Sequence, residues 1–242
     1  MIQTAAILAA GMGTRLESGL KDRPKGFLTL GARPIVEESV LRLQRAGIHS
    51  IVIVTGYRSE YYDQLAARYP GVIKTVRNQR FADSGSLYSL YQARAELTGP
   101  FLLLESDLIY EPRALAVLLE GPASACLLSG PTGAGDEVYV ETRDGQLVSM
   151  SKKPNALGAT PTGELVGISR ISPDLLAVML SFGETTFRST LRVDYETDGL
   201  VAAARTQPVW CPLVADLLWA EIDDARHLER ARSEVYPRLP PV

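Results

Sequence analysis

The chain has 242 residues, 46% of them hydrophobic, and a formal net charge of −3. This length suits one large α/β domain or a domain with a small lid, and the apolar fraction is enough for a full core. A weakly acidic chain is not typical of proteins that bind nucleic acid or a membrane surface. We therefore expect any anion site to be local, built from a few Lys, Arg and backbone N–H groups.

The first half of the chain alternates strand-like and helix-like segments. The expected strands are Thr4–Ala9, Ser50–Thr55, Ile73–Val76, Phe101–Glu105 and Ala123–Leu128, and the expected helices are Ile35–Ala46, Ser59–Tyr69 (capped by Ser59), Ser84–Leu97 and Pro112–Leu119. This order indicates an α/β fold with a Rossmann-like, mostly parallel mixed sheet flanked by helices. Ligands bind such sheets beyond the carboxyl ends of the strands, which points to the loops after Ala10, Thr55 and Glu105.

The second half is richer in β-structure. The expected elements are a hairpin from Val138–Thr142 and Gln146–Ser151 around Asp144-Gly145, a strand Gly163–Ile171, a helix Ser172–Phe182 capped by Ser172, a loosely helical Ser189–Ala204, strands Val209–Val214 and Trp219–Ile222, and a closing helix Asp224–Val235. We expect a single domain over residues 1–242, in which the segment at about 130–215 contributes a small lid on the acceptor side.

Targeting and metal-binding segments of the common kinds are not evident. No run of about 18 apolar residues predicts a membrane span, and the start lacks the charged n-region of a signal peptide, so a cytoplasmic location is expected. The two cysteines, Cys126 and Cys211, lie in apolar runs and are expected to be buried thiols rather than a disulfide. Two His and two separated Cys give no zinc spacing.

A glycine-containing loop follows the first strand. It reads Ala9-Ala10-Gly11-Met12-Gly13-Thr14-Arg15-Leu16 and is followed by Asp22-Arg23-Pro24-Lys25. Glycine lets the backbone approach phosphate with positive φ, and successive N–H groups then bind an anion. Arg15 and Lys25 add positive charge where a triphosphate would lie. A dinucleotide-binding loop would need glycine where Leu16 stands, a Walker A loop is absent, and the whole string argues against a simple turn with solvated charges.

The string AAGMGTRL…DRPKGFLTLGARPIVEESVLRLQRAGI resembles the nucleotidyltransferases that include sugar-1-phosphate enzymes and cytidylyltransferases of small phospho-acceptors. The resemblance implies that Gly11, Gly13, Thr14 and Arg15 wrap the NTP phosphates, and that Lys25 contacts the α-phosphate. It places Leu8, Ala9, Ala10 and Met12 in the same nucleotide-binding loop.

Two acidic motifs are candidates for a metal site. Asp107 closes Leu104-Glu105-Ser106-Asp107 after a buried strand, and it is either a surface turn residue or a Mg²⁺ ligand. In Glu221-Ile222-Asp223 the alternation of a strand places Glu221 and Asp223 on one face, and Asp224 then caps the last helix. The resemblance implies that Asp107 and Asp223 bind Mg²⁺, with Glu221 beside them, and that Lys25, Arg15, Asp107 and Asp223 are catalytic.

The segment Asn78–Leu90 is similar to a stretch of bacterial phosphocholine cytidylyltransferases, and closer still to their relatives that act on phosphonates such as 2-aminoethylphosphonate. The resemblance implies that Asn78, Ser84, Gly85 and Ser86 lie beside the base of CTP. The plainer alternative makes Ser84 a helix cap and Ser86 a first-turn residue.

A cationic acceptor group would need carboxylates or aromatic faces. The candidates are Tyr139, Glu164, Asp194, Glu196 and Trp219, although Glu164 and Glu196 also suit solvated positions and Trp219 suits the core. Lys152 or Lys153 resembles the second lysine of the family, which meets the acceptor phosphate. No aromatic cage is evident, which leaves a primary amine or a neutral phosphonate open.

The expected reaction is in-line attack of a small phosphonate or phosphate on the α-phosphate of CTP, with Mg²⁺ and release of pyrophosphate. The preferred acceptor is 2-aminoethylphosphonate, followed by phosphocholine. The alternatives are a sugar-1-phosphate nucleotidyltransferase and a nucleotide-binding regulatory module without turnover. The oligomeric state stays open, a homodimer included.

Overall fold

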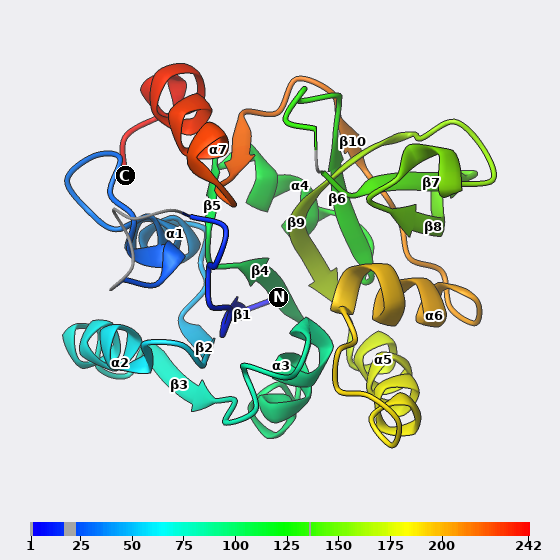
Figure 1. Ribbon diagram of the computed structural model, residues 1–242, viewed down its shortest axis with the longest axis horizontal. Coiled ribbons are helices and arrows are strands. Elements are labelled where there is room, and N and C mark those ends of the chain that lie inside the picture. Colours follow the sequence, from blue (N-terminus) through cyan, green and yellow to red (C-terminus); the bar gives the residue numbers. More distant parts are fainter. Residues whose placement is uncertain (1, 17–22, 136) are drawn as a thin grey trace.

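We describe residues 2–16, 23–135 and 137–242 of the computed structural model, so Asp22 of the glycine-loop string lies outside the described residues. Within them, a nine-stranded sheet crosses the molecule (Figure 1). Seven of its strands follow the order β10-β6-β9-β4-β1-β2-β3, and β7 and β8 extend from β9. Their bounds are β1 Thr4–Ala9, β2 Ser50–Thr55, β3 Ile73–Arg77, β4 Phe101–Glu105, β6 Ala125–Ser129, β7 Tyr139–Arg143, β8 Gln146–Ser151, β9 Gly163–Ile171 and β10 Leu213–Val214.

The sheet changes direction at β1. From β1 the chain steps outward through β2 and β3, and it then crosses to β4 on the other side of β1. Both neighbours run parallel to β1, and Leu8 of β1 pairs with Glu105 at the end of β4. The strand order therefore reverses at β1, and α/β proteins bind ligands beyond the carboxyl ends of the strands at such a switch point.

Helices cover both faces of the sheet, because successive strand residues face opposite sides. Ala5 and Ile7 pack in one core with α1 (Ile35–Arg45), α2 (Ser59–Arg68) and α4 (Arg113–Glu120). Ala6 and Leu8 pack in a second core with α3 (Ser86–Gln92), α5 (Pro173–Thr186) and α6 (Val201–Ala204). The alternation predicted for an α/β fold is confirmed.

A third, smaller core lies under the C-terminal segment. The strands β5 (Leu108–Tyr110) and β11 (Trp219–Glu221) pair antiparallel, and α7 (Ala225–Arg230) follows β11. Asp224 caps α7 by accepting from the His227 backbone N–H, as expected. The Ser172 side chain likewise accepts from the Leu175 N–H and caps α5.

The segment expected to form a lid is divided between the sheet and its edge. Asp144 and Gly145 both have positive φ, 51° and 75°, and they close the predicted β7–β8 hairpin. In contrast, β9 lies inside the sheet, antiparallel to β4 and β6. The hairpin lies off the main strand path, and its role as an acceptor-side lid stays a prediction.

The expected cap Ser59 and the alternative cap Ser84 are both wrong. The α2 helix begins at Ser59 with the left-handed Arg58 as its cap residue, so Ser59 is inside the helix. The α3 helix begins at Ser86 after an extended Gly85, because the Ser84 hydroxyl is already bonded to Asn78. The expected helix continues only as a short 3₁₀ turn at Arg94–Glu96.

Two further segments are less regular than expected. In the segment expected to be helical from Ser189 to Ala204, residues 191–193 run beside Gly85 and Leu87, whose N–H groups donate to Leu191 and Val193. Helical structure there begins as a π-turn at Tyr195–Leu200. In the expected strand Val209–Val214 only Leu213–Val214 is regular, because Pro212 has no N–H to donate to the ladder.

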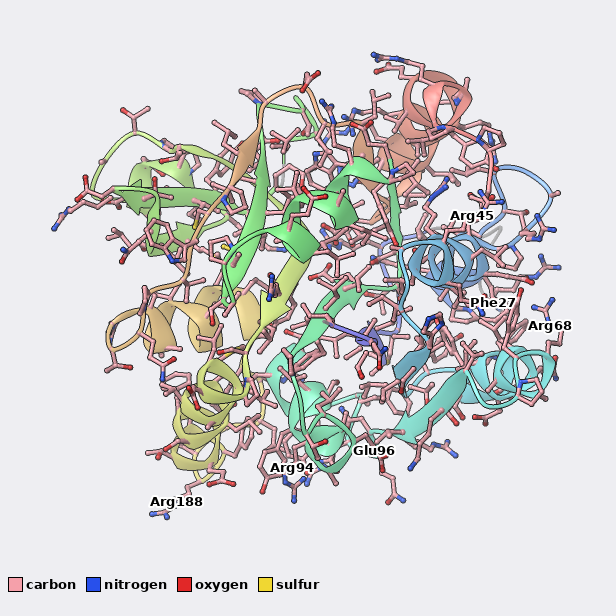
Figure 2. All side chains as sticks on the ribbon, turned by 180° about the vertical axis from the view of Figure 1, so that it is seen from behind. Phe27, Arg45, Arg68, Arg94, Glu96 and Arg188 are labelled. Atoms are coloured by element: carbon pink, nitrogen blue, oxygen red, sulfur yellow. The ribbon has the colours of Figure 1, made fainter. Side chains whose placement is uncertain are left out.

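Figure 2 shows Phe27 between α1 and α2, whereas Arg68, Arg94 and Arg188 lie at the periphery. Cys126 and Cys211 are buried free thiols with their sulfur atoms 3.3 Å apart, as expected. In the part of the chain described above, every helix is too short or too polar to cross a membrane. The cytoplasmic location stays a prediction.

Candidate active site

A cavity of about 280 Å³ opens where β1 and β4 end. Three chain segments meet there: the glycine loop after β1, the loop from β3 into α3, and the segment after β4. Predicted site residues that line it are Leu8, Ala10, Gly11, Gly13, Lys25, Ser84, Gly85, Ser86, Asp107, Lys152, Asp194 and Glu196. The switch point therefore brings together residues from both halves of the chain.

Lys25 reaches the cavity from a 3₁₀ turn, Lys25–Phe27. The Phe27 ring packs edge-on against Tyr61 and Tyr62 of α2, with ring centroids 5.2 and 5.1 Å apart, and this fixes the turn. Gly13 has φ +62°, and a Cβ there would lie 3.0 Å from Lys25 Cγ. Glycine therefore suits this position for two reasons. It adopts the positive φ easily, and it leaves room for the close approach of the lysine side chain.

The ammonium group of Lys25 is held between two carboxylates. Its Nζ lies 3.0 Å from Asp107 Oδ2 and also bonds Asp223 Oδ1, while Arg15 Nη2 lies 2.6 Å from Asp223 Oδ2. Burial alone would lower the pKa of Lys25, but Asp107 and Asp223 outweigh it and raise that pKa above its ordinary value. Burial would raise the pKa of Asp223, yet Lys25 and Arg15 lower it. At neutral pH both groups are charged.

A cluster of carboxylates lies next to this pair. Oxygens of Glu105, Asp107 and Glu221 all come within 4.8 Å of one another. Burial, followed by the neighbouring carboxylates, raises the pKa values of Glu105 and Glu221. An all-oxygen donor set in which like charges are crowded suits a hard divalent cation such as Mg²⁺. As the alternation predicts, Glu221 and Asp223 face this side, whereas Ile222 packs in the third core.

Sequence reasoning missed Glu105 as a candidate. The signal was present, because Glu105 and Asp107 are two residues apart and residues at this spacing share a face of a strand. The cavity is also lined by Tyr62, Phe81, Ser89 and Ser106, which were not predicted. Phe81 and Ser89 lie within the segment Asn78–Leu90, but Tyr62 comes from the buried face of α2 and its sequence position carries no comparable signal.

Two further carboxylates, of Asp194 and Glu196, line the cavity beside Ser86. Ser86 Oγ lies 3.4 Å from both Asp194 Oδ1 and Glu196 Oε2, and it accepts from the Tyr195 N–H at 2.8 Å. Burial and then the charge of Asp194 raise the pKa of Glu196 to about 7. Lys152 also lines the cavity. Ser86, which was expected beside the base, thus lies against Asp194 and Glu196.

Asn78 lies behind the cavity wall rather than in it. It is fully buried, and its Nδ2 donates to Ser84 Oγ at 2.9 Å and Ser89 Oγ at 3.0 Å. The expected contact of Asn78 with a base is therefore indirect, through serines that do line the cavity.

Several predicted residues do not line the cavity. Trp219 is 1% exposed within the core, so the structure supports the core alternative and not an acceptor contact. Glu164 is buried and accepts from the Thr132 N–H, which explains it as a support for that loop. Tyr139 is half-buried on β7. Lys152 and Lys153 are both exposed, and of this pair Lys152 lines the cavity. Ala9 is core, and Met12 and Thr14 are exposed on the glycine loop.

Comparison with known proteins identifies the family of the chain. Residues 5–233 match the family described as the MobA-like NTP transferase domain. A 2-aminoethylphosphonate cytidylyltransferase of Lancefieldella rimae is 32% identical over 70% of this chain and 68% of its own length. A choline-phosphate cytidylyltransferase of Streptococcus pneumoniae is 33% identical over 44% of this chain, and the match spans 46% of that enzyme.

Solved structures share the fold. The inositol-1-phosphate CTP transferase from T. maritima superposes with a TM-score of 0.79 over 99% of this chain and 98% of its own, at 18% identity. The Rossmann-like mixed sheet is therefore common to both proteins.

Proposed function

We propose that this chain, which belongs to the MobA-like NTP transferase family, transfers CMP from CTP to a small phosphonate or phosphate with a primary amine, releasing pyrophosphate. One observation carries the proposal. A single cavity at the switch point is lined by Lys25, which lies between two aspartates, and by the carboxylates of Asp194 and Glu196. Its relatives include cytidylyltransferases named for 2-aminoethylphosphonate and for choline phosphate, which supports both the CTP and the acceptor class.

The phosphate side of the site is formed by the glycine loop and Lys25. Backbone N–H groups between Gly11 and Arg15 bind the triphosphate, for which the positive φ of Gly13 is suited. Lys25 stabilises charge that grows on the oxygens of the α-phosphate during in-line attack. Asp107 and Asp223 keep its ammonium charged and aimed before the nucleotide arrives.

Mg²⁺ would be held by Asp107 with Glu105 and Glu221, and with Asp223 beside them. When bound, it neutralises phosphate charge and brings two anions close together. The acceptor oxygen is already anionic at neutral pH, so no residue of the chain has to remove a proton from it. The work of the protein is to position the two substrates and to stabilise charge.

The carboxylates of Asp194 and Glu196 in the cavity wall favour a primary amine over a quaternary ammonium. A primary ammonium donates hydrogen bonds to carboxylates such as Asp194 and Glu196, whereas a trimethylammonium group has no N–H and is bound best by several aromatic faces. Two aromatic residues, Tyr62 and Phe81, are among the residues described as lining the cavity. Phe81 belongs to the same loop between β3 and α3 as Ser84. Lys152, which lines the same cavity, would meet the acceptor phosphonate. We therefore rank 2-aminoethylphosphonate before phosphocholine.

A screen of pyrophosphate release tests the proposal. The purified chain with Mg²⁺ is assayed with each of four NTPs against 2-aminoethylphosphonate, phosphocholine, 2-hydroxyethylphosphonate and glucose-1-phosphate. We expect release with CTP and 2-aminoethylphosphonate, less with phosphocholine, and none with the sugar phosphate. Preferred use of glucose-1-phosphate would assign the chain to the sugar-1-phosphate branch instead.

Two variants test the residue roles in the same assay. Lys25→Met should reduce kcat by about 10²–10³, as removal of one oxyanion donor does in other enzymes. Asp107→Ala should abolish turnover while circular dichroism shows the fold unchanged. Tight CTP binding without release by the wild type would support the alternative of a regulatory module, and near-full activity of Asp107→Ala would refute the metal assignment.

A further inference from the structure

Cys126 and Cys211 form a pair of thiols that the proposed reaction does not use. Cys126 lies in β6, and Cys211 lies 85 positions further along the chain, shortly before β10. Both belong to the second core, with exposed fractions of 0% and 6%, and neither is among the described residues that line the active-site cavity. Their sulfur atoms are 3.3 Å apart. Only a short movement therefore separates the two thiols from a bond.

The backbone holds the two cysteines opposite each other. Ala125 of β6 and Trp210 pair in a parallel bridge, so Cys126 and Cys211 are the next pair in the register that β10 keeps with β6. The Cys126 N–H donates to the Trp210 carbonyl at 2.8 Å. Neighbouring strands lie about 4.7–4.9 Å apart, and a disulfide needs Cα atoms about 4.4–6.8 Å apart. Rotation of the two side chains is therefore enough to bring the sulfur atoms into bonding distance.

The segment that carries Cys211 also supports the β7–β8 hairpin. On the side away from β6, the Cys211 N–H donates to the Gly145 carbonyl in the hairpin turn, at 2.8 Å. The Leu147 N–H of β8 donates to the Val209 carbonyl, also at 2.8 Å. The hairpin is thus attached to β6 through residues 209–211. A covalent bond between the sulfur atoms would fasten this attachment.

We propose that Cys126 and Cys211 are an oxidation site, at which hydrogen peroxide converts the two thiols into an intramolecular disulfide. The thiolate of Cys211 attacks one peroxide oxygen, the O–O bond breaks, and the other oxygen leaves as water with the proton of that thiol. The sulfur of Cys126 then attacks the resulting sulfenic acid. The S–S bond forms, and the sulfenic hydroxyl leaves as a second water with the Cys126 proton. The two thiols lose two electrons, and the peroxide gains them.

The order of the two steps follows from the surroundings of the thiols. Cys211 is the more accessible of the pair. The hydrogen bond to Cys211 and then burial raise the pKa of the Cys126 thiol, so Cys126 retains its proton. Peroxide therefore reacts first at Cys211, and Cys126 acts as the resolving thiol. Hydrogen peroxide is also small enough to enter where a bulky oxidant is excluded.

The test follows the two thiols of the purified chain, which are its only cysteines, during treatment with hydrogen peroxide. We expect two reactive thiols in the unfolded chain before treatment and none afterwards, with a mass lower by two hydrogen atoms. Peptide mapping should find the Cys126 and Cys211 peptides joined, and dithiothreitol should reverse the change. Because a bridge across a long loop restricts the unfolded chain, the Tm should rise by at least about 5 °C.

Cys126→Ala and Cys211→Ala are the matched controls. With peroxide, neither variant should gain an intramolecular disulfide or a higher Tm, and Cys126→Ala should accumulate a sulfenic acid at Cys211 that dimedone traps. The wild type alone decides the matter where a variant fails to fold. Two free thiols after prolonged excess peroxide, sulfinic or sulfonic acids without a disulfide, or a disulfide only between chains would overturn the proposal. A disulfide that left the Tm unchanged or lower would refute the fastening of the hairpin.

Discussion

Glu196 changes charge near neutral pH, because burial and the charge of Asp194 raise its pKa to about 7. The group is mostly neutral at pH 6 and mostly ionised at pH 8. An amine acceptor needs the ionised carboxylate, so we expect its KM to fall by up to about tenfold between these pH values. Initial rates at varied acceptor and saturating CTP, measured from pH 6 to 8, give this KM directly.

The acceptor's own phosphonate also ionises in this range, with a pKa of about 6 by analogy with phosphate. Glu196→Gln separates the two effects, because the variant retains the acceptor's ionisation and lacks the carboxylate. Its KM should be higher at pH 8 and should depend less on pH than that of the wild type. Identical pH profiles for both proteins would show that Glu196 does not meet the amine.

At the scale of secondary structure, α1 and α2 are joined by an ion pair away from the cavity. Arg68 donates two hydrogen bonds of 2.9 Å to the buried carboxylate of Glu37, which also accepts from the Tyr69 hydroxyl at 2.8 Å. Arg68→Ala would leave that carboxylate buried with one partner. We expect a loss of about 1–3 kcal/mol in the free energy of unfolding, measured by urea denaturation, with kcat unchanged.

Two further variants show whether the buried charge is the cause. Adding Glu37→Gln to Arg68→Ala removes the charge and should recover part of the stability. Arg188→Ala, at the exposed periphery near the end of α5 (Figure 2), should change the free energy of unfolding by no more than about 0.5 kcal/mol. A loss equal to that of Arg68→Ala in this control would point to a general charge effect.

Elements set by local patterns were predictable, and elements set by distant pairing were not. The apolar runs of β1, β2 and β4 and the Asp144-Gly145 turn are local, and each formed as expected. The segment before Tyr195 is not helical, because its carbonyl groups accept from Gly85 and Leu87, more than 100 residues earlier in the chain. That pairing places Asp194 and Glu196 beside Ser86, and no spacing within the sequence reports it.

The same distinction applies to the site. Lys25, Asp107 and Asp223 were predicted from motifs, and the structure brings Lys25 within hydrogen-bond reach of both aspartates. Asn78 was predicted as a base contact, but its burial behind two serines depends on how the loop after β3 folds onto α3. Trp219 was ambiguous because a tryptophan suits a core and a binding face equally well, and only packing decides.

At the scale of the whole molecule, the glycine loop lies at the switch point of a sheet that has helices on both faces. Because the site is formed only when this sheet is folded, ligand binding should stabilise the entire fold. A ligand at 100 times its Kd adds about 2.7 kcal/mol to the free energy of unfolding. For a chain of this size that corresponds to a rise in Tm of about 5–10 °C, because each kcal/mol shifts Tm by about 2–4 °C. We expect CTP with Mg²⁺ to produce this shift in a thermal melt.

The shift should depend on the metal. Without a divalent cation, the triphosphate meets the carboxylates of Glu105, Asp107 and Glu221 and is repelled, so CTP with EDTA should move Tm far less. Lys25→Met removes the ammonium group that would contact the phosphates, so it should also reduce the shift with CTP. Mg²⁺ alone should still raise the Tm of this variant, because the carboxylates proposed to bind the metal remain. A full shift in EDTA would show that nucleotide binding does not need the metal, and it would confine Mg²⁺ to the chemical step.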